Sequence, residues 1–112
     1  MFFKQVDTGF DRNFSYIIAD EKTREAVVTD PSQDTSRLLS IIEEEKFKVL
    51  YILNTHAHID HIIGNKTIIE KTKAKPLSVK DNQIIKIGKL KIKAIFTPGH
   101  APDHFCFLVE NK

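Results

Sequence analysis

Thr55-His56-Ala57-His58-Ile59-Asp60-His61 is the stretch of sequence that indicates both the fold and the chemistry of this 112-residue chain. It gathers three of the five histidines, together with one carboxylate, into seven residues. At this composition, an H-x-H-x-D-H pattern arises by chance in about one chain in a thousand. Imidazole nitrogens and carboxylate oxygens are groups that bind a divalent cation such as Zn²⁺. The stretch therefore predicts a metal-dependent hydrolase.

The spacing within this stretch suits two neighbouring metal ions. His56 and His58 are two residues apart, so in extended backbone both rings point to one side and can face the same ion. Asp60 and His61 come where we expect a helix to begin, and the change of backbone turns them toward a second ion. We expect Asp60 to act as the catalytic group, because a carboxylate near a metal-bound water can orient that water or accept its proton.

A fourth histidine, His100, follows a Thr97-Pro98-Gly99 turn directly after a predicted strand. With His56 and His58 it would complete a three-histidine site with an open fourth position, which lowers the pKa of a zinc-bound water to about 7. Two other interpretations are incidental surface histidines and a closed structural site. The regular spacing argues against incidental surface histidines. The scarcity of cysteine argues against a closed structural site, because such sites favour cysteine ligands. We expect the fifth histidine, His104, to be an exposed loop residue.

Composition predicts one small domain over residues 1–112, with 41% hydrophobic and 29% charged residues. The net charge of +2 is too small to indicate a nucleic-acid partner, and the lysines of the second half are spread out. No apolar run approaches the length of a membrane span. Cys106 is the single cysteine, which excludes an intramolecular disulfide and favours a reducing compartment, so we expect a cytoplasmic location.

Hydrophobic patterning predicts a mixture of strands and helices, of the α/β (α+β) class. The run from Val49 to Leu53 is apolar throughout and suits a sheet that is covered on both faces. Both histidine groups follow directly after predicted strands, where loops often carry catalytic residues. The expected helices are 35–46 and 62–73, and the expected strands are 2–6, 14–19, 26–29, 48–54, 77–79, 84–86, 90–96 and 105–109.

Three stretches carry a resemblance to a known family: Val27–Pro31, Asn54–His61 followed by Gly64-Asn65, and Thr97–His104. These stretches occur in the order and spacing of the metallo-β-lactamase fold superfamily, which the chain therefore resembles. Within it the chain is most similar to the branch of glyoxalase II (hydroxyacylglutathione hydrolase) and the related persulfide dioxygenases. The resemblance extends over the whole chain, and its motifs are specific for the fold but much less so for the substrate.

This resemblance implies the N-terminal half of a four-layer αββα sandwich, with a mixed sheet and two main helices. It places His56, His58 and His100 at a first metal site, and Asp60 and His61 at a second. Family members take a bridging aspartate and a final histidine from the second half of the domain, and neither follows the last predicted strand here. We therefore expect residues 1–112 to form a single truncated domain.

Two further residues match supporting positions of the family. Asp30 matches an aspartate that lies behind the metal site and orients a ligand. Gly99 matches a tight-turn glycine that lets His100 reach inward.

The function implied by the resemblance is hydrolysis of a small-molecule thioester, such as an acylglutathione, by metal-bound hydroxide. The implied cofactor is one or two Zn²⁺ ions, with iron or manganese as alternatives. Two other functions stay open: a non-heme iron persulfide dioxygenase, and an inactive metal-binding or interaction fragment. We expect neither a nucleic-acid nor a membrane partner, and we expect self-association or complementation by a C-terminal half, because half a sandwich leaves a sheet face uncovered.

Overall fold

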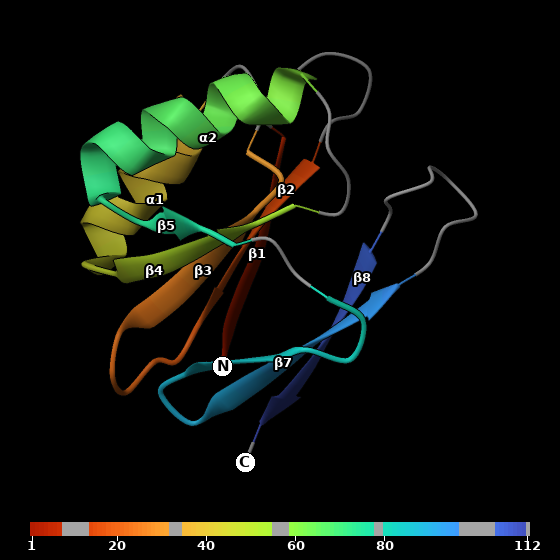
Figure 1. Ribbon diagram of the computed structural model, residues 1–112. Coiled ribbons are helices and arrows are strands. Elements are labelled where there is room, and N and C mark those ends of the chain that lie inside the picture. Colours follow the sequence, from red (N-terminus) through yellow and green to blue (C-terminus); the bar gives the residue numbers. More distant parts are fainter. Residues whose placement is uncertain (8–13, 32–34, 55–58, 78–79, 97–104, 112) are drawn as a thin grey trace.

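The computed structural model describes residues 1–7, 14–31, 35–54, 59–77, 80–96 and 105–111 (Figure 1). Two helices and eight strands follow one another in the order β1 (Phe2–Asp7), β2 (Phe14–Ala19), β3 (Glu25–Thr29), α1 (Ser36–Glu45), β4 (Lys48–Leu53), α2 (Ile59–Thr72), β5 (Lys75–Pro76), β6 (Ile84–Ile87), β7 (Leu90–Phe96) and β8 (Phe105–Asn111).

The strands form two sheets. The larger sheet has the order β1-β2-β3-β4-β5 and the smaller one the order β6-β7-β8. In the larger sheet β1, β2 and β3 are antiparallel, whereas β3, β4 and β5 are parallel because α1 and α2 serve as the crossover connections. The smaller sheet is an antiparallel meander. The predicted mixed sheet with two main helices is confirmed.

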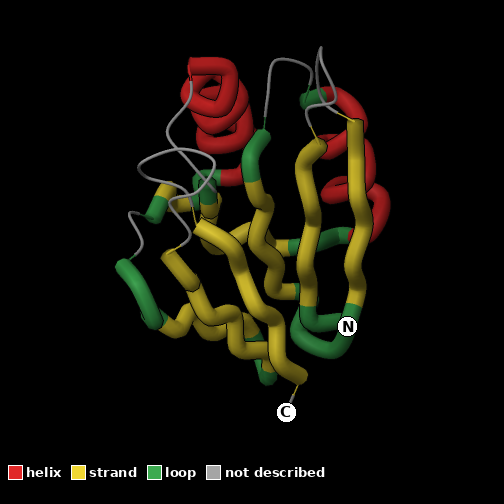
Figure 2. The backbone as a smooth tube through the Cα atoms, turned by 90° about the vertical axis from the view of Figure 1, so that its right-hand side faces the viewer, coloured by secondary structure: helices red, strands yellow, loops and turns green. Residues whose placement is uncertain are grey.

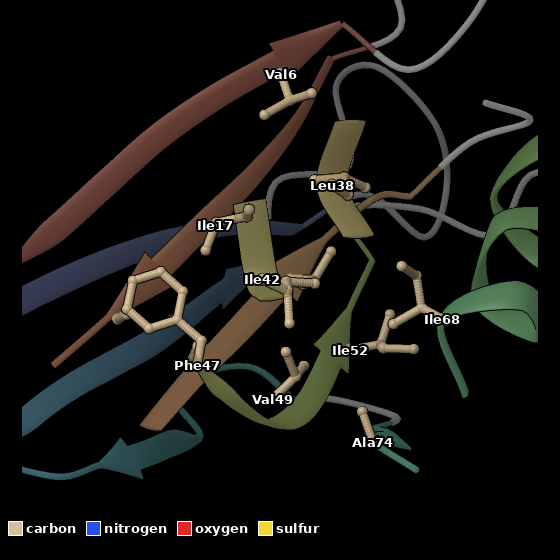
Figure 3. Close-up of a cluster of buried hydrophobic side chains, with 12 residues drawn as sticks. Val6, Ile17, Leu38, Ile42, Phe47, Val49, Ile52, Ile68 and Ala74 are labelled. Atoms are coloured by element: carbon tan, nitrogen blue, oxygen red, sulfur yellow. The ribbon is translucent and has the colours of Figure 1, made fainter. Parts of the chain in front are cut away.

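Both helices cover one face of the larger sheet (Figures 1 and 2). Leu38 and Ile42 of α1 and Ile68 of α2 pack there against buried residues of the strands, among them Ile17 and Ile52 (Figure 3). Ile17, Leu38, Ile52 and Ile68 are fully buried. This first core fixes the helices on the sheet.

A second core joins the two sheets. Val27 of β3 and Leu53 of β4 point to the face opposite the helices and pack against Ile85, Ile87 and Ile92 of the smaller sheet. The larger sheet is therefore covered on both sides, as the apolar run of β4 predicts. The layers run helix, sheet, sheet, which are three of the four layers expected for an αββα sandwich.

Strand β4 contains a bulge against β3. The register shifts between the pairs formed by Ala26 and Val27, so that Leu50 is left without a counterpart in β3. As a result Val49 and Ile52, three positions apart, both contribute to the helix-side core. Strict alternation would place these two side chains on opposite faces of the sheet.

The elements differ from the sequence-based expectations at two places. Helix α2 begins at Ile59, earlier than the predicted start at residue 62. The strand expected at 77–79 is replaced by β5 at Lys75–Pro76, and residues 78 and 79 lie outside the described part of the chain. Proline is tolerated there because β5 is an edge strand, which needs hydrogen bonds on one side only. Among the described residues, no helix is long and apolar enough to cross a membrane.

Two carboxylates, one just after β2 and one at the start of β3, connect the β2–β3 hairpin to the turn between β6 and β7. The Lys89 N–H donates to Asp20 Oδ2 at 2.7 Å, and the Gly88 N–H donates to Glu25 Oε1, also at 2.7 Å. Asp20 Oδ1 also accepts the Lys22 N–H at 2.9 Å. Gly88 has φ +52°, a left-handed conformation that glycine adopts with little strain. We call Asp20, Glu25, Gly88 and Lys89 the inter-sheet clamp.

The clamp predicts acid sensitivity. The backbone N–H groups of Lys89 and Lys22 hold the pKa of Asp20 below its usual value of 3.8. A carboxyl whose pKa is lowered by folding stabilises the fold above its unfolded-state pKa, and this contribution is lost as pH falls through the lower folded-state value. We expect Asp20→Asn to unfold at a lower temperature than wild type at neutral pH, and this difference to shrink below pH 3.8.

Thermal unfolding of both proteins across this range checks the prediction. Glu44→Gln is a suitable control, because Glu44 is an exposed carboxylate of α1. The role given to the Asp20 charge would be contradicted if the unfolding temperatures of Asp20→Asn and wild type differed as much in acid as at neutral pH.

Candidate metal centre

Three of the five predicted metal ligands belong to two connections, residues 55–58 between β4 and α2 and residues 97–104 between β7 and β8. His56, His58 and His100 lie outside the described residues, as does Gly99. Within the described part of the chain, no group of three or more His, Cys, Asp or Glu side chains is arranged to hold a metal ion. The convergence of the three histidines therefore stays a prediction.

The backbone places the other two predicted ligands in the first turn of α2. This helix begins at Ile59, so Asp60 and His61 follow the 55–58 connection immediately. The first turn of a helix carries a partial positive charge from its unpaired N–H groups, which favours a carboxylate such as that of Asp60. The earlier start of α2 thus brings Asp60 and His61 into the helix rather than into the loop before it.

The described elements that lead into these connections lie away from the chain termini. In Figure 1 the ends of β3 and β4 and the start of α2 lie in the upper half of the molecule, and the end of β7 and the start of β8 lie on its right-hand side, whereas both chain termini lie at the lower end. In the upper half the Asp30 N–H donates to the Leu53 carbonyl at 2.9 Å, which continues the parallel pairing of β3 with β4. The chain therefore leaves β3 and β4 at neighbouring points, and the 55–58 connection follows β4.

Asp30 lies at the base of this region. It is 6% exposed and has φ +48°, a left-handed conformation that aspartate tolerates better than most residues. Its carbonyl oxygen accepts a hydrogen bond from Ser15 Oγ at 2.6 Å, and Ser15 itself is fully buried. These bonds fix the backbone at Asp30, and they suit the supporting role that the sequence predicts for it.

Two asparagine side chains join the end of β4 to α2. Asn65 Nδ2 donates to Asn54 Oδ1 at 2.8 Å, and Asn54 Nδ2 donates back to Asn65 Oδ1 at 3.4 Å. Asn54 Nδ2 also lies 3.5 Å from Asp30 Oδ1. No sequence pattern indicates this contact, because it joins the residue after a strand to a residue within a helix, 11 positions apart.

A buried hydroxyl completes the polar groups of this region. Thr29 is 3% exposed, and its Oγ1 has no hydrogen-bond partner among the described residues. An unpaired buried hydroxyl costs about 1–3 kcal/mol, so such groups collect where other polar atoms are close by. Hydroxyl, amide and carboxylate groups at the base of a histidine-bearing loop are the kind of surroundings that orient metal ligands. The residues present therefore fit a metal centre.

The fold and this polar end define the class of protein. A mixed sheet lies between helices and a second sheet, and its candidate site follows the carboxyl ends of parallel strands. The family model of the metallo-beta-lactamase superfamily matches residues 6–90. The chain belongs to this superfamily.

Comparisons with individual proteins agree with this assignment. The chain is 32% identical to a hydroxyacylglutathione hydrolase of Dictyostelium discoideum over 113 residues, which is 89% of this chain and 42% of the relative. It is 30% identical to the human mitochondrial persulfide dioxygenase ETHE1, over 88% of this chain and 44% of the relative. The chain thus spans less than half the length of these curated relatives.

Solved structures show the same partial coverage. The crystal structure of ETHE1 from Myxococcus xanthus superposes with a TM-score of 0.87 at 28% identity, covering 97% of this chain and 54% of that one. A metallo-beta-lactamase from Staphylococcus aureus gives a TM-score of 0.84 at 28% identity, covering 99% and 39% respectively. The described elements therefore correspond to one part of a larger known fold.

Proposed function

We propose that the chain forms the metal-binding part of a metal-dependent hydrolase of the glyoxalase II-like type, acting on a thioester such as an acylglutathione. The single observation that carries this proposal is the H-x-H-x-D-H stretch, which follows a buried parallel strand in a member of the metallo-beta-lactamase superfamily. The similarity to hydroxyacylglutathione hydrolases supports the substrate class.

In this proposal His56, His58 and His100 hold one ion, while Asp60 and His61 contribute to a second site. A bound zinc ion would supply Lewis acidity and lower the pKa of a coordinated water. Asp60 would orient a water toward the thioester carbonyl or accept a proton from it. The buried carboxylate of Asp30 orients a ligand from below.

Persulfide oxidation at iron is the second candidate function. Two comparisons support it. The identity to human ETHE1 is close to the identity to the hydrolases, and the chain superposes on the Myxococcus xanthus protein. In this alternative the same histidines would hold iron rather than zinc.

An inactive fragment that works through association is the third candidate. It is supported by the partial coverage of the relatives and by apolar groups on the outer face of the smaller sheet. Ile84 of β6 and Leu108 of β8 are 54% and 47% exposed, and both pair with Lys93 of the strand between them. We propose this face as the surface for self-association or for complementation by a C-terminal half.

One pair of assays separates these functions. We expect the zinc-loaded chain to release thiol from an acylglutathione and the iron-loaded chain to consume no oxygen with a persulfide substrate. The Dictyostelium hydroxyacylglutathione hydrolase serves as the positive control for thiol release. Oxygen consumption by the iron-loaded chain would support the dioxygenase instead, and inactivity in both assays would support the fragment.

The ligand assignment is tested separately from activity. We expect the double variant His56→Ala, His58→Ala to lose zinc binding, because the remaining predicted ligands cannot complete either site. Zinc content after dialysis, measured by atomic emission, checks this. His104→Ala is the matched control and should keep the wild-type zinc content. An unchanged content in the double variant rules out the assignment.

A further inference from the structure

Asn54 and Asn65 lie on the two sides of the predicted metal-ligand segment. Asn54 follows the last residue of β4 and comes just before Thr55 and His56. Asn65 lies in the second turn of α2, after the helix has begun at Ile59. A contact between these side chains therefore fixes the distance between the point where the segment leaves the sheet and the helix that it enters.

The contact is specific in direction as well as in distance. The short bond of 2.8 Å has the Asn65 amide as donor and the Asn54 carbonyl as acceptor. The Asn54 amide nitrogen faces both the Asn65 carbonyl at 3.4 Å and the Asp30 carboxylate at 3.5 Å. Both asparagines are half-buried, so water competes less with these bonds than it would at the surface. Side chains from β4 and α2, and from the residue after β3, are thus joined in one network.

Apolar contacts outside this network hold α2 on the sheet. Ile68 is fully buried in the helix-side core, and Ile69 packs against the same core. The amide pair contributes little apolar burial to the helix. Its position instead suits the task of restricting the segment that carries His56 and His58.

We propose that Asn54 and Asn65 are positioning residues that raise the metal affinity of the adjoining histidines by holding both ends of residues 55–58. This inference rests on the proposed metal site. A segment that is restricted before binding loses less conformational freedom when its side chains converge on an ion, so the ion binds more tightly. Residues that orient metal ligands typically change metal affinity by about 10–100-fold when they are replaced.

The test compares zinc affinity with the stability of the metal-free chain. We expect Asn65→Ala and Asn54→Ala each to weaken zinc binding by about 10–100-fold in competition with a chromophoric chelator. We expect the double variant to bind zinc as tightly as each single variant does, because the two side chains act as one unit. Asn65→Asp keeps the size of the side chain but replaces the donor with oxygen, and it should also weaken binding.

Lys66→Ala is the matched control, because Lys66 is the exposed neighbour of Asn65 on the same helix. Its zinc affinity should equal that of wild type, and the thermal unfolding of all metal-free variants should stay close to wild type. Zinc affinities that are unchanged in the asparagine variants, or that fall only in proportion to stability, would overturn the positioning role alone. A wild-type chain that binds no zinc would contradict the proposed function as well.

Discussion

The parallel pairing of β3 with β4 is the constraint on which the candidate site depends. It ends with the hydrogen bond from the Asp30 N–H to the Leu53 carbonyl, so the chain leaves both strands at adjacent points. Helix α1 is the crossover that makes this pairing parallel, α2 does the same for β4 and β5, and both helices return on the same face of the sheet. Asp30 and Asn54, the residue that precedes the histidine-bearing segment, are neighbours because β3 and β4 are.

The two cores and the inter-sheet clamp keep this pairing in place. The helix-side core holds α1 and α2 on the sheet, and the core between the sheets holds the meander of β6 to β8 on the other face. The clamp joins the sheets at the lower end of the molecule in Figure 1, opposite the candidate site. The strand ends at the site are therefore positioned by packing on both faces and by fixed turns at the far end.

The sequence predicted the layers of the fold, but not the contacts that surround the candidate site. Apolar periodicity predicted the mixture of strands and helices, the run from Val49 to Leu53 predicted a sheet covered on both faces, and the family resemblance implied the mixed sheet. The bulge at Leu50 could not be foreseen, because it depends on how β4 pairs with β3 and leaves no mark in composition. The Asn54–Asn65 pair was missed for the same reason, since its partners meet only after α2 has packed. The predicted ligands His56, His58 and His100 fall outside the described residues, so their convergence stays a prediction that rests on the family motif.

The central claim is that imidazoles from two separate connections bind one cation. The most direct measurement is a long-range ¹H–¹⁵N spectrum of the histidine rings during zinc titration of the ¹⁵N-labelled chain. The account predicts that the ring nitrogens of His56, His58 and His100 shift together and saturate at the same zinc ratio, while those of His104 do not shift. A titration in which His56 and His58 shift but His100 stays unchanged would contradict it.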